Sequence, residues 1–245
     1  MGDSPARGLD RRDFLRIGLA AGSATLASAC GWDGGPLVRP SLLAISKLND
    51  RIGSSLHTNA RLAREYPLAA RSRLVPSYFV SPETPVLADP AGWRLEVGGN
   101  VRKPGRFSVA ELRRLPTVRY TVKHHCVEGW TTVATWAGVP FSALAAQVEP
   151  TAEARFVRFD SFDANRAGTA YYNGWDIESA MHPQTIIAYA FNDRPLLPDH
   201  GAPARLYSPV KLGYKLTKYL TRITFTDTKP GGYWEDQGYP WLGGI

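Results

Sequence analysis

The chain of 245 residues contains two cysteines, Cys30 and Cys126, and the second lies in the sequence Lys-His-His-Cys-Val-Glu-Gly-Trp. Cys30 ends an apolar N-terminal stretch of the kind that is cleaved or anchored on export. An exported chain therefore keeps one internal cysteine, which cannot form an internal disulfide unless it pairs with Cys30. The thiol of Cys126 is either a soft ligand for a metal ion or a small buried side chain without chemical function.

The residues before Cys126 predict a β-strand. Residues 118–122 are Val-Arg-Tyr-Thr-Val, rich in the β-branched and aromatic types that favour strands. Alternation along this strand places His124 and Cys126 on one face. Gly129 interrupts the strand, so we expect Cys126 and Glu128 at its end or just past it, where functional sites are common.

Two segments nearer the C-terminus carry side chains suited to an anionic ligand. Arg205 offers a planar fork of donors to a phosphate, and Lys215 offers a compact positive charge. Gly213 lets the backbone approach a ligand closely because it has no Cβ atom. His200 alone is typical of a capped surface turn.

These motifs resemble those of one family. Cys-x-Glu-Gly-Trp at 126–130 followed by Trp-x-Gly-Val-Pro at 136–140 resembles the metal-ligand segment of the molybdopterin-dependent oxidoreductases of the sulfite oxidase fold. That group includes sulfite oxidases and periplasmic methionine sulfoxide reductase catalytic subunits. The resemblance implies that Cys126 is the only protein ligand to molybdenum, and that a pterin dithiolene and oxo groups supply the rest.

The resemblance also implies a fold and a set of cofactor contacts. The fold is α+β, mostly mixed β-sheet with short helices. His-Gly-x-Pro-x-Arg and Gly-Tyr-Lys resemble the segments that hold the pterin phosphate and ring edges. The residues implied to bind molybdopterin are Val80, Ser81, Ser161, His200, Arg205, Gly213, Tyr214 and Lys215.

Glu128 matches a position near the metal in the reductase subunits. Reduction of a sulfoxide consumes two protons and two electrons, and a partly buried carboxyl group with a raised pKa can supply protons near neutral pH. The alternative is a structural hydrogen bond to nearby backbone. His125 and His182 are further candidates, although a lone histidine is more often structural.

The sequence departs from sulfite oxidases after residues 77–81, which we predict as a strand. Those enzymes carry Arg-Asn-His here, with the arginine facing the substrate anion, whereas this chain continues Val80-Ser81-Pro82-Glu83. We therefore expect two-electron oxygen-atom transfer in which a sulfoxide or a related S- or N-oxide is reduced, with sulfite oxidation as the alternative. A non-catalytic, lipid-anchored binding protein on the same fold also stays open. A zinc site built from His124, Cys126 and a distant histidine is the last alternative.

The N-terminus predicts export. Residues 10–16, Asp-Arg-Arg-Asp-Phe-Leu-Arg, form a twin-arginine pattern, and the apolar stretch 17–29 is shorter than the ~20 residues of a membrane-spanning helix. We expect a periplasmic protein, with a lipid on Cys30 as a further possibility. The predicted layout is a signal peptide at 1–29, a linker or peripheral arm at 30–75, the molybdopterin domain at 76–228 and an aromatic tail at 229–245.

Short strands and a few short helices are predicted within the domain. A capping box, Ser108 with Glu111, begins one helix. The expected strands besides those above are 93–97, 156–159, 185–190 and 222–225, and the expected helices are 108–115, 140–144 and 176–180.

The formal net charge of +7 comes without a run of basic residues, so we expect no nucleic-acid partner. The sequence has no Cys-x-x-Cys-His haem motif and too few cysteines for an iron-sulfur cluster. A small-molecule substrate and a separate redox partner, a membrane b-type cytochrome or a soluble cytochrome, are therefore expected. The aromatic residues of the tail favour packing onto the protein's own core. The alternatives are a lid over the metal and a patch that docks an electron donor.

Overall fold

The computed structural model describes residues 35–56 and 61–245. Contacts divide the chain into two units, Met1–Leu48 and Asn49–Ile245. Helix α2, Gly35–Leu56, lies within the segment that the sequence predicts as a linker or peripheral arm. The twin-arginine pattern, the apolar stretch and Cys30 lie outside the described residues. Among the helices of the described ranges, none has the length and apolar character needed to cross a bilayer.

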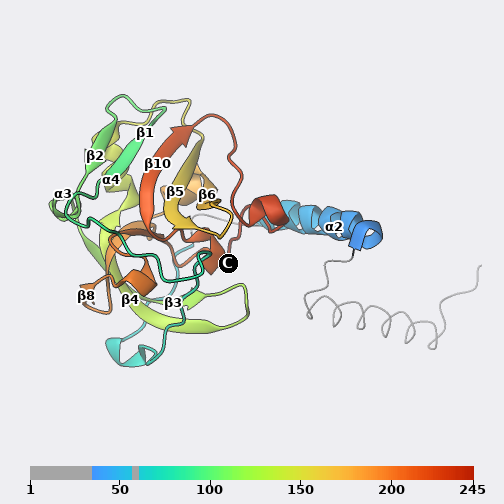
Figure 1. Cartoon of the computed structure of the whole chain (residues 1–245), viewed down its shortest axis with the longest axis horizontal. Coiled ribbons are helices and arrows are strands. Elements are labelled where there is room, and N and C mark those ends of the chain that lie inside the picture. The colour runs from blue at the N-terminus through green and yellow to red at the C-terminus, as the bar shows by residue number, and fades with distance from the viewer. Residues whose placement is uncertain (1–34, 57–60) are drawn as a thin grey trace, which may run out of the picture. The chain divides into compact units, whose positions relative to one another are not determined.

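Two five-stranded sheets form the folded body (Figure 1). In the first, the order is β2-β1-β10-β5-β6, and the β1/β10 pair is parallel while its other pairs are antiparallel. This mixture confirms the predicted α+β class with mixed sheet. The strands are β1 (Leu95–Gly99), β2 (Gly105–Phe107), β5 (Phe156–Ala164), β6 (Ala170–Asp176) and β10 (Leu220–Thr226).

The second sheet has the order β3-β4-β7-β8, and β9 pairs with β7. All of its pairs are antiparallel. Its strands are β3 (Val118–His125), β4 (Thr131–Pro140), β7 (Ile186–Phe191), β8 (Arg194–Pro195) and β9 (Arg205–Tyr207).

The short helices begin where local sequence favours them. The Ser108/Glu111 capping box is present and begins α3 (Val109–Leu112). Helix α4 (Phe141–Val148) follows β4 directly and buries residues at i, i+3, i+4 and i+7. Its Phe141 ring packs 5.7 Å from that of Phe159 on β5, so α4 joins the two sheets through one core. The remaining helices are α5 (Ile177–Ala180) and the 3-10 turns Leu68–Ala70, Pro198–His200, Gly213–Lys215 and Glu235–Gln237.

The strand predicted at 77–81 is wrong. This segment is irregular, because the amide groups of Val80 and Ser81 donate to the two carboxylate oxygens of Asp163 on β5, each at 2.9 Å, rather than to a neighbouring strand. The carboxylate of Asp163 thus accepts the hydrogen bonds that the backbone of a neighbouring strand would otherwise accept. Sequence periodicity cannot reveal that exchange.

Residues 61–75 pack along β3. Tyr66 donates its backbone amide to the Thr121 carbonyl at 2.8 Å, and Gln184 bonds both backbone groups of Ala63. His182 contacts the Arg61 carbonyl through Nε2 at 3.1 Å, which is the structural role that a lone histidine most often has.

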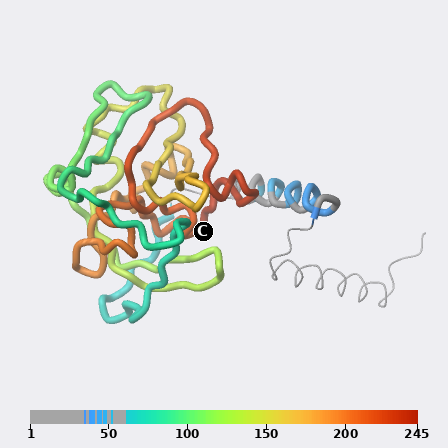
Figure 2. The backbone as a smooth tube through the Cα atoms, viewed as in Figure 1, coloured from blue at the N-terminus to red at the C-terminus, as the bar shows by residue number. Residues whose placement is uncertain are grey.

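The C-terminal segment after β10 packs back onto the body (Figure 2). Lys215 and Glu235 form an ion pair whose side chains are only 1% and 4% exposed. Tyr214 donates its hydroxyl to the Pro240 carbonyl at 2.6 Å, and the Tyr233 amide donates to Tyr172 on β6 at 2.9 Å. The predicted packing of the tail onto its own core is therefore present in this structure.

Candidate active site

A tight turn between β3 and β4 presents Cys126. The Gly129 amide donates to the Cys126 carbonyl at 3.2 Å, and the Cys126 amide donates to the Trp130 carbonyl at 3.0 Å. Gly129 has φ +90°, a conformation that glycine adopts without strain. The turn places Cys126 and Glu128 just past the end of β3, as the sequence predicts.

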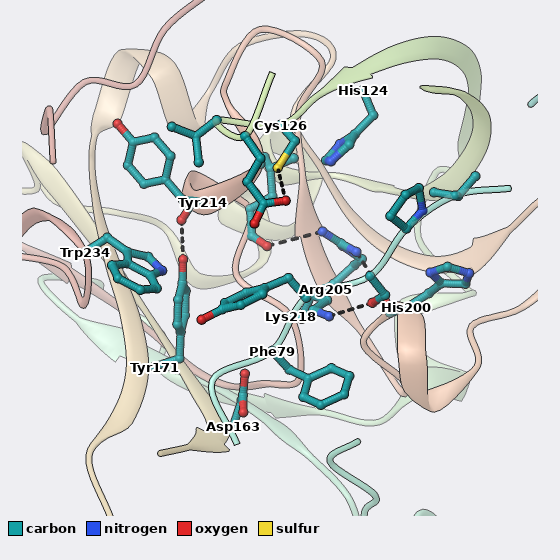
Figure 3. Close-up of a pocket in the computed structure, with 18 of the residues that line it drawn as sticks. Phe79, His124, Cys126, Asp163, Tyr171, His200, Arg205, Tyr214, Lys218 and Trp234 are labelled. Atoms are coloured by element: carbon teal, nitrogen blue, oxygen red, sulfur yellow. Dashed lines mark hydrogen bonds between the residues drawn. The ribbon is translucent and has the colours of Figure 1, made fainter. Parts of the chain in front are cut away.

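A cavity of about 190 Å³ lies beside this turn (Figure 3). His124 and Cys126 both line it, which agrees with their expected place on one face of the strand. Two groups of lining residues differ in chemistry. The basic wall comprises His124, His200, Arg205 and Lys218, and the aromatic wall comprises Tyr78, Tyr171, Trp234 and Tyr239.

Arg205 is a buried cation without a carboxylate partner among the described residues. It is 6% exposed, and its terminal nitrogens donate to the carbonyls of His200 at 3.1 Å and Leu216 at 3.3 Å. Its Nε is buried without a hydrogen-bond partner, and the guanidinium lies over the Trp136 ring at 4.8 Å. Burial lowers the pKa of Arg205 to about 10.

Lys218 adds a second positive charge to the same wall. Its Nζ donates to Ser77 Oγ at 2.9 Å and to the Asp199 carbonyl at 3.2 Å, and it forms no ion pair among the described side chains. Burial, reinforced by the nearby Arg205, lowers the pKa of Lys218 to about 7. Asp163 and Asp199 raise this pKa, but each does so by less than burial or Arg205 lowers it.

The two histidines of the basic wall are held neutral. Burial and Arg205 lower the pKa of His124 to about 3 and that of His200 to about 4. His124 Nδ1 is buried without a partner. An added Cβ atom at Gly213 would meet His124 Nε2 at 3.2 Å, so the missing side chain lets this backbone pass close to His124.

Cys126 and Glu128 form a pair at the cavity edge. The Cys126 thiol donates to Glu128 Oε2 at 3.8 Å, and Trp130 Nε1 donates to the same oxygen at 2.9 Å. Burial raises the pKa of Cys126, so the free side chain is a thiol. A bound cation would stabilise the thiolate instead, as metal coordination does.

Most of the predicted site residues meet at this cavity. Ser161 lines it and accepts the Asp163 amide at 2.9 Å through its hydroxyl. The predicted residues that line the cavity are Cys126, Glu128, Ser161, His200, Arg205, Gly213 and Tyr214.

Three predicted cofactor contacts are placed elsewhere. The amides of Val80 and Ser81 are bonded to Asp163, and the residues just before them line the cavity instead. Lys215 points to the tail, where its Nζ bonds the Gly174 carbonyl at 2.9 Å and pairs with Glu235. Lys218, three residues further on, takes the place in the cavity that the sequence assigned to Lys215.

The cavity fits molybdopterin. The unpartnered Nε donor of Arg205, together with Lys218, suits an anionic phosphate, and Cys126 offers a thiolate to the metal. Zinc has no comparable site, since the described ranges contain no group of three or more His, Cys, Asp or Glu side chains able to hold a metal ion. These features define a class, the redox enzymes that hold a metal through one thiolate and an organic anion through basic groups.

The family follows from comparison with known proteins. Residues 82–234 match the family described as "Oxidoreductase molybdopterin binding domain", and this match covers more than half of the chain. The chain belongs to this family and is an oxidoreductase whose cofactor is molybdenum-molybdopterin.

Several known proteins are similar to the chain. The putative protein-methionine-sulfoxide reductase subunit YedZ1 of Azospira oryzae is 36% identical over 236 residues, 96% of this chain and 87% of its own length. The protein-methionine-sulfoxide reductase catalytic subunit MsrP of Campylobacter jejuni is 31% identical over 58% of this chain, which spans about half, 52%, of that relative.

A solved structure has the same fold. The sulfane dehydrogenase SoxCD from Paracoccus pantotrophus aligns with a TM-score of 0.52 and 23% identity, over 59% of this chain and 40% of that one. The likeness confirms the fold predicted from the sequence motifs.

Lys218 gives a pH test of the basic wall in the cofactor-free protein. Because folding lowers its pKa from 10.5 to about 7, the unfolded chain binds the proton more tightly, so stability rises as pH increases through this window. The neighbouring charges oppose one another, since Arg205 lowers the pKa and Asp163 and Asp199 raise it. We expect Lys218→Met to stabilise the cofactor-free protein at pH 7 by roughly 1–2 kcal/mol, after allowing for partial exposure.

Urea unfolding of the cofactor-free protein at pH 7 and pH 10 measures this effect. The gain in stability between these pH values should shrink in Lys218→Met. Lys229 is exposed, so Lys229→Met serves as the control and should keep the full gain in stability between pH 7 and pH 10. An unchanged pH dependence in Lys218→Met would contradict the assignment.

Proposed function

We propose that this molybdopterin oxidoreductase reduces a sulfoxide or a related S- or N-oxide by oxygen-atom transfer. The main observation in support of this function is that Cys126 and Glu128 lie together at one cavity, which has a basic wall and an aromatic wall. For a sulfoxide, the sulfur–oxygen bond breaks, two electrons and two protons are taken up, and a thioether and water are formed. Names of similar proteins as methionine sulfoxide reductases support this direction.

Each group of residues has a distinct task in this proposal. When bound, the cofactor supplies the two-electron redox change. Cys126 binds the metal, and Arg205 and Lys218 bind the cofactor's anionic groups. Glu128, held by Trp130, carries a proton at its carboxyl group to the oxygen that leaves the substrate.

Sulfite oxidation is the second candidate, and the charge distribution counts against it. The basic wall is assigned to the cofactor, and Ser81 stands where sulfite oxidases carry arginine. The amide of Ser81 is bonded to Asp163, whose negative charge disfavours an anionic substrate nearby.

A separate redox partner completes the proposed reaction. Some relatives are named catalytic subunits, which implies a second subunit in those proteins. For this chain we propose a membrane b-type cytochrome or a soluble cytochrome, because the sequence has no Cys-x-x-Cys-His haem motif and its two cysteines are too few for an iron-sulfur cluster.

Periplasmic location belongs to the same proposal. The twin-arginine pattern at Arg11 and Arg12 supports export of the folded, cofactor-loaded chain, and Cys30 is the candidate for lipid attachment. Cell fractionation checks it: replacing both arginines by lysine should retain the protein in the cytoplasm. An unchanged periplasmic fraction would contradict this route.

Steady-state assays of the loaded enzyme test the function. With a reduced viologen dye as donor, the enzyme should reduce dimethyl sulfoxide and N-acetylmethionine sulfoxide. Glu128→Gln should lower kcat about 100-fold, the usual scale of a lost proton donor, without loss of molybdenum. The exposed Glu83→Gln is the matched control and should behave as wild type. Oxidation of sulfite with no reduction of any sulfoxide or N-oxide would overturn the proposal.

A further inference from the structure

The aromatic wall lies on the opposite side of the cavity from the positive charges. In Figure 3, Trp234 and Tyr171 stand on one side of the region below Cys126, whereas Arg205 stands on the other. The rings of Trp234 and Tyr239 lie 5.1 Å apart, and those of Trp234 and Tyr78 lie 6.3 Å apart. These three rings therefore form a continuous uncharged surface.

This surface is reached from solvent. Tyr78 is 54% exposed and Tyr239 is 36% exposed, unlike the buried Arg205 at 6%. The rings of Tyr78 and Tyr239 are therefore open to solvent, whereas the Arg205 guanidinium is not. The exposed side of the cavity suits a substrate that comes and goes, and the buried basic side suits a resident cofactor.

The chemistry of the rings selects an uncharged group. Sulfur and methyl groups make favourable contacts with aromatic rings, and sulfur prefers a distance of about 5 Å from the ring. The Asp163 carboxylate lines the cavity and acts electrostatically on Tyr78, so it disfavours an anion on this side. A methyl sulfoxide, neutral and dipolar, satisfies both conditions.

We propose that Trp234, with Tyr78 and Tyr239, forms the subsite that binds the uncharged S-methyl end of a methyl sulfoxide substrate. This inference rests on the proposed function and names its substrate class. Trp234 is its central ring, because it contacts both of the other two.

The buried Lys215–Glu235 pair positions this subsite. Glu235 follows Trp234 directly, and its carboxylate pairs with Lys215, which also bonds the Gly174 carbonyl of β6. Pro240 follows Tyr239 directly and accepts the Tyr214 hydroxyl at 2.6 Å. Each tail ring therefore adjoins a residue fixed to the body, and Glu235 is a positioning residue for Trp234.

Kinetics of the loaded full-length enzyme test the subsite. With N-acetylmethionine sulfoxide, Trp234→Ala should raise KM roughly tenfold, which corresponds to about 1.4 kcal/mol, while kcat and molybdenum content stay within about twofold. Trp234→Phe keeps a ring and should recover most of the affinity. An unchanged KM in Trp234→Ala would overturn the subsite.

The positioning role has its own pair of variants. Glu235→Ala should raise KM without lowering kcat, and Glu235→Gln, which still accepts a hydrogen bond from Lys215, should restore KM. A loss of kcat at unchanged KM in Glu235→Ala, or no rescue by Glu235→Gln, contradicts the positioning role.

Binding separates failure of the subsite from failure of the proposed function. Ligand-observed NMR with dimethyl sulfoxide should show contact with loaded wild type and a loss of contact in Trp234→Ala. If the loaded enzyme reduces no sulfoxide but this difference in binding persists, the proposed reaction fails and the subsite stands. If sulfoxides are reduced and binding is equal in both proteins, the subsite alone fails.

Discussion

The site depends on two positive charges that share one cavity without a paired anion. Arg205 and Lys218 are held by backbone carbonyls, an aromatic ring and a hydroxyl, and burial lowers the pKa of both. Keeping such groups out of water costs free energy unless a ligand supplies the opposite charge. An anionic cofactor that binds only the folded chain removes this cost and stabilises the fold by mass action.

The two sheets bring the remaining chemistry to these charges. The β3–β4 turn in the second sheet carries Cys126, and β5 of the first sheet carries Ser161 and Asp163, while the segment that joins β9 to β10 carries Lys218. Helix α4 packs against the first sheet directly after β4, which fixes the sheets to one core. The thiol, the basic wall and the aromatic wall therefore face one space because one core sets the positions of all three.

Local sequence patterns revealed the parts of the site that lie on short motifs. Alternation before Cys126 and the glycine after it predicted where the thiol stands, and the resemblance to family motifs implied Arg205 and Gly213. Lys215 and Lys218 could not be told apart in this way. The chain passes through a 3-10 turn at Gly213–Lys215 and irregular backbone beyond it, so periodicity does not say which lysine faces the cavity.

Long-range contacts explain the other differences. Asp163 captures the amides of Val80 and Ser81 from a distance of more than 80 residues in sequence, which removes the strand expected at 77–81. The tail was expected to pack on its own core, and it does so while Trp234 and Tyr239 also line the cavity. Contacts between segments that are distant in sequence determine both the irregular segment at 77–81 and the position of the tail. Amino-acid composition cannot predict such contacts.

Metal analysis of the protein tests the central claim most directly. Full-length chain made in a host that assembles molybdopterin would be analysed by mass spectrometry beside Cys126→Ser, with circular dichroism to show that the variant is folded. The account predicts about one molybdenum per wild-type chain and its loss from the folded variant. Wild-type protein without molybdenum, or a variant that retains it in full, would contradict the assignment of Cys126 as the metal ligand.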